Sequence, residues 1–418
     1  MEAKEFARIL MSHGARGVYW VGGCVRDEIL GLSPKDHDIL VEGISGEAFR
    51  RLFPQAVLTG KKFPVYCLPV DGETMEIAFA RRERKTGAGH CGYEVDASVD
   101  VTLEEDLFRR DLTMNAMARD ILTGRLVDPF HGMRDLGEGR IRAVSECFKE
   151  DALRALRAAR QAAAYGFDIE EATVRMMGEC REELALEPLE RVVREMERAL
   201  SAKKPSLYFR WLVKAGLLET VHPEIFRLMG QIQPKEYHPE GDAFEHSMMV
   251  LDRVAERTED VKTRFAALFH DIGKGTTPKE ELPRHHGHDL RGAEIVRGLP
   301  RQYKKEWKKA AAFAARHHMR VHAMRRKGKI VSLYEELRRN ARLSMEEFRR
   351  IVEADRGLRG ENAPWFLDGK IMEAVLSSGN YALEGMSPEQ KKKRVRQERI
   401  RILAGYESKS AGEKRRGE

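Results

Sequence analysis

The sequence predicts an α/β head, with a mixed sheet and flanking helices, followed by an entirely helical remainder. Two observations lead to this fold class. Short runs rich in β-branched and aromatic residues occur within the first 140 residues, at Gly17–Val21, His37–Val41, Phe63–Val70 and Thr74–Ala80. After about Ser145 such runs become few, and Ala, Leu, Glu and Arg recur with the period of helices. At about 150 residues per domain, a chain of 418 residues has room for several domains.

Changes in composition divide the chain into four expected parts. They are a head (1–140), a helical neck and body (141–230), a second helical domain (231–360) and a basic helical tail, partly disordered (361–418). Within the helical parts we expect helices at Phe148–Tyr165, Leu189–Leu200 and Leu207–Leu218. The Pro- and Gly-containing stretch at 230–241 is typical of a linker.

The composition excludes several classes of protein. The chain is 42% hydrophobic and 34% charged, so it can bury large cores beneath an ionised surface. It lacks an apolar run of about 18 residues, which argues against a membrane span, and its first residues do not resemble a secretion signal. The five cysteines are odd in number and never spaced C-x-x-C, which argues against a disulfide framework and a thiolate zinc site. We expect a cytoplasmic protein with no membrane contact and no stable protein partner.

The positive charge of the chain is concentrated in two segments. Residues 301–330 contain 11 Lys and Arg and one Glu, and residues 389–418 contain 11 Lys and Arg and five Glu. The net charge is +7, so the remaining 358 residues carry −9. An acidic body with two basic segments favours a partner with a phosphate backbone. Solvated helix faces would give the same pattern.

The sequence GGCVRD at 22–27 follows the first expected strand and opens a helical stretch. Paired glycines at such a turn let backbone N–H groups approach a phosphate, and Arg26 in the first turn of the helix can bind the same anion. An ordinary tight turn fits these residues equally well.

Asp36 and Asp38 flank His37 at the start of the second expected strand. Residues i and i+2 of a strand share a face, so both carboxylates point to the same side. Oxygen ligands of this kind bind Mg²⁺, which phosphoryl transfer commonly requires. Glu76 on another expected strand is a possible third carboxylate. Two solvated acids at a strand start remain the alternative.

The expected helix 148–165 has arginines close to its apolar side. With Asp151 set at 0° and about 100° per residue, Arg154 lies outside the apolar arc, Arg157 borders it and Arg160 lies within it. A desolvated guanidinium is costly without an anionic partner. Arg157 and Arg160 are therefore expected to bind a carboxylate or a phosphate.

Together these motifs resemble the class II tRNA nucleotidyltransferases, the CCA-adding enzymes of the polymerase-β superfamily, in the bacterial form that carries an HD domain. The resemblance covers most of the chain. Its motifs, in order, are GGCVRD, DHD, ERKTGAGHCGY (83–93), RRDLTMNAMA (109–118), DPFHGMRDL (128–136), EDALR (150–154), FEH (244–246) and HDIGKG (270–275).

The resemblance implies a Mg²⁺-dependent, template-independent addition of CCA to tRNA 3′ ends from CTP and ATP, releasing pyrophosphate. It implies Mg²⁺ binding by Asp36 and Asp38, triphosphate binding by Gly23 and Arg26, nucleotide contacts by Arg110, Arg157 and Arg160, and base selection by Asp151 and Arg154. The glycine-spaced loop 87–92 corresponds to one that takes part in switching from C to A addition. A partial CC- or A-adding enzyme and a poly(A) polymerase remain alternatives.

The role of Asp151 and Arg154 also follows from the hydrogen-bond donors and acceptors that each base presents. Cytosine and adenine both present an exocyclic amine beside a ring-nitrogen acceptor, so a carboxylate can accept from the amine while a guanidinium donates to the acceptor. Uracil and guanine reverse that pattern on their pairing edge. Mismatches between buried polar groups are costly. The pair is expected to accept C and A and to reject U and G.

A second site is expected in the HD region. His246, His270 and Asp271 can converge on a divalent ion (Mg²⁺, Mn²⁺ or Ni²⁺), with Asp355 as a candidate fourth ligand. Further candidate ligands or phosphate contacts are His285, His286, His288, His317 and His318. Relatives with HD domains hydrolyse 2′,3′-cyclic phosphates and phosphomonoesters, so such an activity is expected here, with a purely structural HD domain as the alternative. An RNA-end phosphohydrolase with a nucleotide-binding head is a further alternative.

Overall fold

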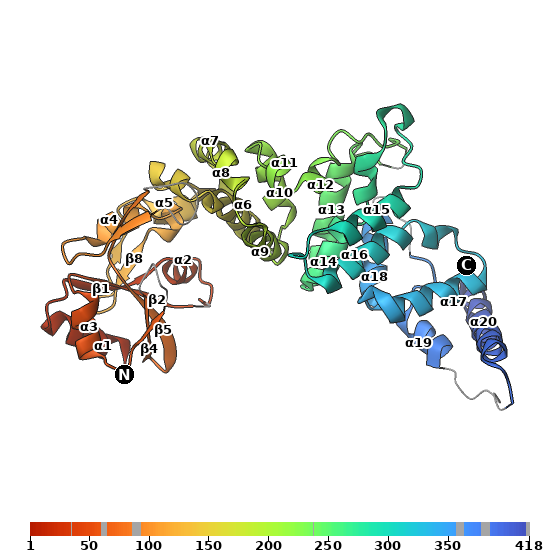
Figure 1. Cartoon of the computed structure of the whole chain (residues 1–418), viewed down its shortest axis with the longest axis horizontal. Helices are drawn as coiled ribbons and strands as arrows, with labels where there is room; N and C mark the ends of the chain where they lie inside the picture. The colour runs from red at the N-terminus through yellow and green to blue at the C-terminus, as the bar shows by residue number, and fades with distance from the viewer. Residues whose placement is uncertain are drawn as a thin grey trace. The chain divides into compact units, whose positions relative to one another are not determined.

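The computed structural model describes residues 1–34, 36–59, 65–85, 93–236, 238–356, 363–377 and 385–414. The chain divides into two compact units, residues 1–195 with 207–221, and residues 196–206 with 222–418. Figure 1 labels their helices and strands. Among the described residues, no helix combines the length and the apolar character needed to cross a membrane.

The first unit begins with a seven-stranded mixed sheet in the order β3-β4-β5-β2-β1-β8-β9. Its strands are β1 (Gly17–Val21), β2 (Asp38–Glu42), β3 (Val57–Thr59), β4 (Val65–Val70), β5 (Glu73–Phe79), β8 (Ala118–Asp120) and β9 (Leu126–Val127). Only β2 and β5 pair in parallel, and the other neighbours are antiparallel. The mixed-sheet head predicted from the sequence is confirmed.

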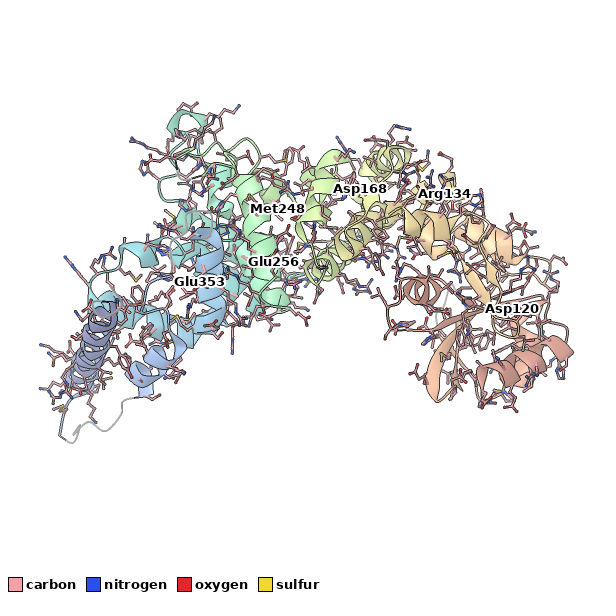
Figure 2. All side chains as sticks on the ribbon, turned by 180° about the vertical axis from the view of Figure 1, so that it is seen from behind. Asp120, Arg134, Asp168, Met248, Glu256 and Glu353 are labelled. Atoms are coloured by element: carbon pink, nitrogen blue, oxygen red, sulfur yellow. The ribbon has the colours of Figure 1, made fainter. Side chains whose placement is uncertain are left out.

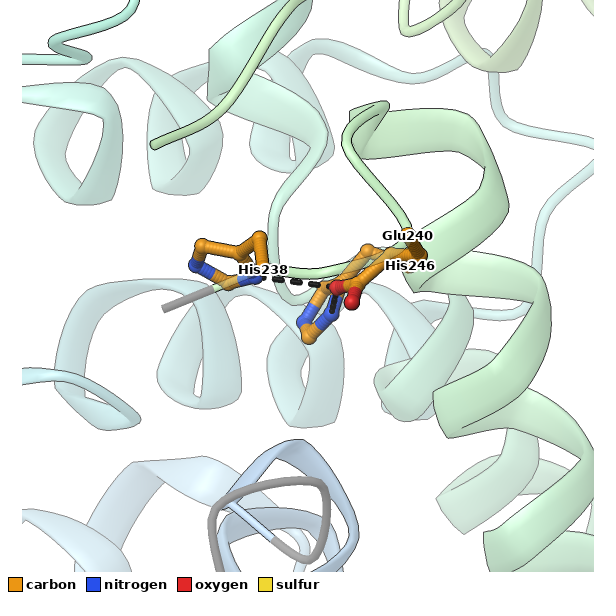
Figure 3. Close-up of side chains that lie close together, drawn as sticks. All are labelled: His238, Glu240 and His246. Atoms are coloured by element: carbon orange, nitrogen blue, oxygen red, sulfur yellow. Dashed lines mark hydrogen bonds and ion pairs between the residues drawn. The ribbon is translucent and has the colours of Figure 1, made fainter. Parts of the chain in front are cut away.

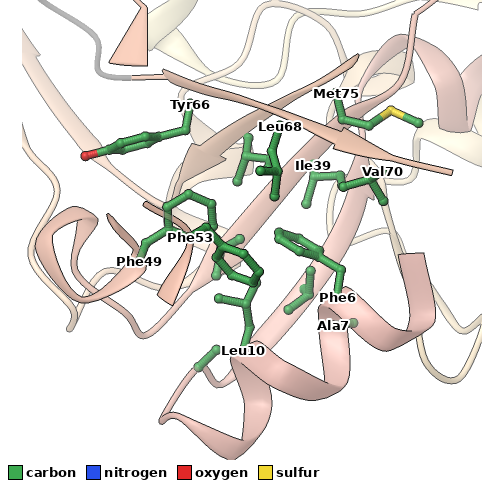
Figure 4. Packing of buried hydrophobic residues seen from close by; sticks show 14 of the residues in the cluster. Phe6, Ala7, Leu10, Ile39, Phe49, Phe53, Tyr66, Leu68, Val70 and Met75 are labelled. Atoms are coloured by element: carbon green, nitrogen blue, oxygen red, sulfur yellow. The ribbon is translucent and has the colours of Figure 1, made fainter. Parts of the chain in front are cut away.

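One face of this sheet is covered by α1 (Ala3–Ser12) and α3 (Gly46–Leu52) (Figure 1). Figure 4 shows Phe6 and Leu10 of α1 beside Phe49 of α3, all fully buried against side chains of the strands. A smaller cluster on Val21 and Leu40 packs with α4 (Leu103–Phe108). Because β2 is buried along its middle, it appears in the sequence as a continuous apolar run. This burial fixes the position of Asp38 at the strand's first residue.

The rest of the first unit is mainly helical. Its elements are α2 (Gly23–Ile29), β6 (Arg82–Lys85), β7 (Tyr93–Asp96), η1 (Thr113–Asn115), α5 (Gly132–Gly137), β10 (Arg140–Ile141), η2 (Glu146–Glu150), α6 (Leu153–Tyr165), β11 (Asp168–Ile169), α7 (Glu171–Glu179), α8 (Arg181–Leu184), α10 (Ser206–Lys214) and α11 (Leu218–Val221). Helix α9 (Leu189–Leu200) begins in this unit, and its residues from 196 onward belong to the second unit. The continuous helix expected at 148–165 is wrong, because the chain is extended at Asp151 and α6 begins only at Leu153. The Asp151 carboxylate accepts the backbone N–H of Leu153 at 3.1 Å and so satisfies a donor at the helix start.

The second unit is built from helices joined by turns and loops, with an isolated bridge between Ile232 and Asp242 in its described part. Its elements are α12 (Pro223–Phe226), α13 (Ala243–Ala255), α14 (Val261–Leu268), η3 (Ile272–Thr276), η4 (Lys279–Glu281), α15 (His288–Gly298), α16 (Lys305–His317), η5 (Arg320–Ala323), α17 (Lys327–Glu336), η6 (Leu337–Ala341), α18 (Met345–Arg356), α19 (Gly369–Ser377) and α20 (Pro388–Lys414). In Figure 2, Met248 marks α13 and Glu353 marks α18, two helices that pack against each other. Asp242 caps α13 by accepting from the backbone N–H of Phe244 and Glu245.

Candidate functional site

The carboxylates of the head meet at the junction of three strands. In the antiparallel pair β1–β2, Val21 lies opposite Asp38, so the turn after β1 comes next to the start of β2. In the parallel pair β2–β5, Asp38 lies opposite Glu76. Partial burial and Glu76 raise the pKa of Asp38, while Arg110 acts in the opposite direction. Asp36, Asp38 and Glu76 nevertheless keep part of their surface open to solvent, Asp38 being surrounded on one side only, and their oxygens are the donor set that Mg²⁺ prefers.

Two arginines lie over the glycine turn that follows β1. Gly22 has φ +75°, and a side chain there would come within 3.0 Å of a terminal nitrogen of Arg110. A side chain at Gly23 would come within 3.4 Å of Arg26. Glycine is therefore required at 22 both for its backbone conformation and for the approach of Arg110. The turn, the carboxylates and both guanidinium groups form one site on the head.

Buried partners hold these arginines in place. Arg26 donates to Asn115 Oδ1 at 2.7 Å and to Asp27 Oδ1 at 2.8 Å, and its guanidinium lies 5.1 Å from the ring centroid of Tyr165. Arg110 pairs with Asp106 at 3.2 Å. Asp106 is fully buried, and although burial opposes its ionisation, Arg110 and Arg109 hold its pKa below the ordinary value. Both guanidinium groups are thus fixed before any ligand binds.

The arginines of α6 are also paired with carboxylates. Arg157 donates to Asp111 Oδ2 at 2.7 Å, and Arg160 donates to Glu195 Oε2 at 2.7 Å. Asp111 is buried; burial opposes its ionisation, yet Arg157 and a hydrogen bond from Asn115 keep its pKa below the ordinary value. The expectation of an anionic partner for these two arginines is confirmed, and that partner is a carboxylate of the chain itself.

Asp151 and Arg154 lie at the start of α6. Contrary to the helical projection, Arg154 is buried, with 8% of its surface exposed. Its Nη1 donates to the carbonyl of Cys147 at 2.7 Å. Among the described residues no hydrogen bond joins the two side chains. Asp151 Oδ1 accepts instead from the N–H of Leu153 at 3.1 Å. The loop 87–92 lies outside the described residues.

The HD region brings its predicted ligands together. His246 on α13 lies 2.9 Å from Asp355 on α18, measured from Nε2 to Oδ1. His270 Nε2 lies 3.3 Å from Asp271 Oδ2 and 3.8 Å from Asp355 Oδ1. All four side chains are buried. Burial opposes protonation of His270, but Asp271 and Asp355 raise its pKa to about 10. A cation is therefore strongly favoured at this position.

Two further residues at this site were missed from the sequence. Glu240 Oε1 lies 2.6 Å from Nδ1 of His246 and 3.0 Å from Nδ1 of His238, so it lies between the two imidazoles (Figure 3). The stretch 230–241, expected as a linker, has no helix or strand among its described residues, and Gln233 N–H donates to Gly241 O at 2.9 Å. The sequence HPEGD at 238–242, with a histidine and two acidic residues, was the signal from which these two residues could have been predicted.

Three families match successive parts of the chain. The "Poly A polymerase head domain" matches residues 18–142, the "Probable RNA and SrmB- binding site of polymerase A" matches residues 166–229, and the "HD domain" matches residues 243–356. The Multifunctional CCA protein of Nitrosospira multiformis is 46% identical over 308 residues, which is 73% of each chain. That of Nitrosococcus oceani is 44% identical over 364 residues, covering 83% of this chain and 87% of the relative. The chain belongs to the multifunctional CCA protein family.

Solved structures agree with this membership. The crystal structure of the Bacillus stearothermophilus CCA-adding enzyme in complex with CTP matches with a TM-score of 0.61 and 25% identity, covering 90% of this chain and 82% of that one. The class II CCA-adding family to which the motifs pointed is confirmed, as is the fold of a nucleotidyltransferase head, a helical body and an HD domain. Divalent metal dependence fits both family matches and both carboxylate sites.

Proposed function

We propose that this multifunctional CCA protein adds CCA to the 3′ ends of tRNA from CTP and ATP. The observation that supports this most directly is the meeting of Asp36, Asp38 and Glu76 with the turn Gly22–Gly23 and its two arginines. Bound Mg²⁺ would supply charge neutralisation for an RNA 3′-hydroxyl attacking the α-phosphate. Its substrates are made in the cytoplasm, which we propose as its location.

The chain's own residues bind and orient the nucleotide. Arg26 and Arg110 bind the triphosphate beside the glycine turn and stabilise the charge that develops as pyrophosphate leaves. Asp106 and Asn115 prevent both guanidinium groups from changing position. Because this positioning is complete in the free protein, little ordering is needed when the nucleotide binds.

Base selection is assigned to Asp151 and Arg154. Asp151 uses one oxygen on the N–H of Leu153, which leaves the other for the exocyclic amine of cytosine or adenine. Arg154 uses one nitrogen on the carbonyl of Cys147 and directs its other donors at the ring acceptor. We assign Arg157 and Arg160 to the nucleotide as well, each anchored by its carboxylate partner.

The test is nucleotide incorporation into tRNA that ends at the discriminator base, with CTP alone, ATP alone, or both. Addition of two C residues from CTP, and one further A when both are present, is expected. Addition that stops after C, or A addition only to tRNA ending in CC, would replace this proposal by a partial enzyme. A long A tail on many RNAs would replace it by a poly(A) polymerase, an alternative that the name of the matched head family keeps in view.

We assign contact with the tRNA backbone to the basic residues around the end of α15 and the start of α16. A cavity of about 620 Å³ there is lined by Arg297, Arg301, Lys305, Lys308 and Lys309, with Glu336 as its one acidic residue. Neutralised phosphates release counterions, so affinity falls with salt. Replacing Arg301 and Lys305 by Ala is expected to weaken tRNA binding and to reduce its salt dependence. A variant with an unchanged salt slope would exclude this surface.

We propose a second activity for the second unit, called the HD unit from here on because it contains the HD domain match at 243–356. This activity is the metal-dependent hydrolysis of 2′,3′-cyclic phosphates or phosphomonoesters. The observation that favours it is the buried convergence of His246, His270, Asp271 and Asp355 beside a cavity of about 570 Å³ whose lining includes Lys274. Replacing His270 by Gln and Asp271 by Asn is expected to abolish the hydrolysis and to leave nucleotide addition unchanged. Hydrolysis that survives both changes would rule out this site.

A further inference from the structure

Tyr165, the last residue of α6, contacts the arginine that follows the glycine turn. Its ring lies against the guanidinium of Arg26, with 5.1 Å between the guanidinium carbon and the ring centroid. Its hydroxyl donates to Oδ1 of Asp27 at 2.9 Å. One side chain of α6 thus holds both members of an Arg-Asp pair on α2.

A single oxygen atom joins the three side chains. Besides the Tyr165 hydroxyl, Asp27 Oδ1 accepts from Arg26 Nε at 2.8 Å and lies 2.8 Å from Arg26 Nη2. The side chains of Arg26 and Asp27 are only 11% and 16% exposed. Hydrogen bonds to an ionised carboxylate are stronger than neutral ones, and poor solvation strengthens them further. Tyr165 therefore fixes the carboxylate that in turn orients the guanidinium.

The Tyr165 hydroxyl keeps its proton near neutral pH. Burial raises the pKa of Tyr165 to about 12, with Arg26 acting in the opposite direction and Asp27 adding to the increase. The phenol is thus a hydrogen-bond donor to Asp27, and never a second negative charge beside it, over the pH range in which nucleotide incorporation is measured.

A second connection leads from Arg26 back to α6. Arg26 Nη1 donates to Asn115 Oδ1 at 2.7 Å, and Asn115 Nδ2 donates to Asp111 Oδ1 at 3.0 Å. The other oxygen of Asp111 accepts from Arg157 of α6 at 2.7 Å. These side chains form a closed circuit that starts and ends on one helix. Arg26 therefore cannot shift without stretching a contact to Tyr165 or to Asn115.

Helix α6 extends between two parts of the nucleotide site. Arg154 in its first turn is assigned to the base, and Tyr165 at its end holds Arg26, which is assigned to the triphosphate. The two positions are about three turns, or roughly 16 Å, apart along the helix axis. The base and the triphosphate are the two ends of one nucleotide. A rigid helix between their binding groups therefore sets the distance at which both are bound.

We propose that Tyr165 is a positioning residue for the triphosphate. By contacting Arg26 and Asp27, it holds the guanidinium in its binding orientation relative to α6 before a nucleotide arrives, which lowers the entropic cost of binding. The inference rests on the proposed function for the role of Arg26, and it adds a residue that touches neither the base nor the reacting atoms. Because CTP and ATP carry the same triphosphate, Tyr165 serves both additions equally.

The experiment compares Tyr165→Phe, which keeps the ring and removes the hydroxyl, with Tyr165→Leu, which removes both contacts. Binding of CTP and ATP to the full chain without RNA is measured by isothermal titration calorimetry, and binding of CMP by displacement. We expect Tyr165→Phe to weaken CTP and ATP binding by about 10-fold and Tyr165→Leu by about 30-fold, because a hydrogen bond to a charged group and then a cation–π contact are lost. CMP, which lacks the β- and γ-phosphates, should bind with unchanged affinity.

A double-mutant cycle shows whether Tyr165 acts through Arg26. Arg26→Lys keeps the positive charge and loses the planar guanidinium that lies against the ring. In that background, Tyr165→Phe is expected to have no further effect on CTP binding, so the two changes are non-additive. Additive effects of the two changes would overturn the proposal, and so would equal losses of affinity for CMP and CTP, which a merely structural role of Tyr165 would produce.

Tyr19 provides a matched control in the same unit. Its hydroxyl also faces a carboxylate, that of Glu42, at 3.5 Å. Tyr19→Phe is expected to leave the affinities for CTP, ATP and CMP unchanged, and circular dichroism of every variant reports folding. Unchanged CTP affinity in folded Tyr165→Phe, with a loss in Arg26→Ala, would overturn the positioning role alone. Unchanged CTP affinity in Arg26→Ala would overturn the assignment of Arg26 to the triphosphate, and the positioning role with it.

Discussion

The head and the HD unit both gather buried carboxylates, but they neutralise them differently. In the head, Asp106 and Asp111 are paired with arginines, which carry their charge at every accessible pH. In the HD unit, Asp271 and Asp355 are surrounded mainly by imidazoles, whose charge depends on protons or on a metal. The geometry of the head is therefore permanent, while that of the HD cluster responds to metal and pH.

The largest expected effect separates the two sites. Asp38→Asn is expected to lower nucleotide incorporation by about 10³-fold, because it removes a charge from the carboxylate group that would bind Mg²⁺. His270→Gln is expected to abolish phosphate-ester hydrolysis. Each variant should keep the activity of the other site, as measured with radiolabelled CTP and with a 2′,3′-cyclic nucleotide. Loss of both activities from either change would mean that the two regions do not act independently.

The side-chain geometry of the head depends on buried ion pairs between arginines and aspartates. A second substitution tests how much these pairs stabilise the protein. Asp111→Asn leaves Arg157 without a counter-charge, a loss of about 3–5 kcal/mol for a fully buried pair. Because the Arg157 side chain is 39% exposed, we expect a smaller loss of stability, about 2–3 kcal/mol, in urea unfolding. The control is Glu138→Gln, which breaks its exposed pairs with Arg134, labelled in Figure 2, and with Arg140, and should have no measurable effect. Equal losses of stability in the two variants would show that burial does not strengthen the ion pair of Asp111.

Much of this architecture could be predicted from the sequence because the signals are local. β1, β2 and β5 lie within a residue or two of the predicted strands, and His270-Asp271 is a contiguous motif. The pairing of Asp38 with Glu76 and of Arg157 with Asp111 depends on register and packing between distant segments, which no local pattern encodes. Asp151 was misassigned because a carboxylate can continue a helix or precede one, and here it lies two residues before α6 and accepts from the N–H of Leu153.

Base selection offers a smaller effect that is confined to the head. Asp151→Ala is expected to reduce the preference of kcat/KM for CTP over UTP and for ATP over GTP by about 10–200-fold, since the carboxylate that accepts the base amine is gone. Glu146→Ala removes an exposed carboxylate from η2, the short helix that ends just before Asp151, and serves as the control. Selectivity that survives Asp151→Ala would assign base selection to other residues.

The smallest expected effect is on the pH dependence of stability, which should differ between the two units. Burial lowers the pKa of His222, in the second unit, to about 3. The unfolded chain, with an ordinary histidine pKa of about 6.5, then binds more protons than the folded one, so stability falls with acidification between these values by about 1.4 kcal/mol per pH unit. The lowered pKa values of Asp106 and Asp111 act only below about pH 4, where the unfolded carboxylates protonate.

The second unit should therefore lose stability at a pH at which the head is unaffected. Its Trp307 and Trp365 report its unfolding in urea once Trp20 and Trp211 of the first unit are replaced by Phe. Chelated protein is compared with His222→Leu at pH 7.5, 6.5 and 5.5. The stability difference between the two should change by about 1 kcal/mol from pH 6.5 to 5.5 and by only a few tenths of a kcal/mol above that range. Parallel curves would show that His222 is not kept neutral by burial, and acid sensitivity would then have to come from the imidazoles around Asp271.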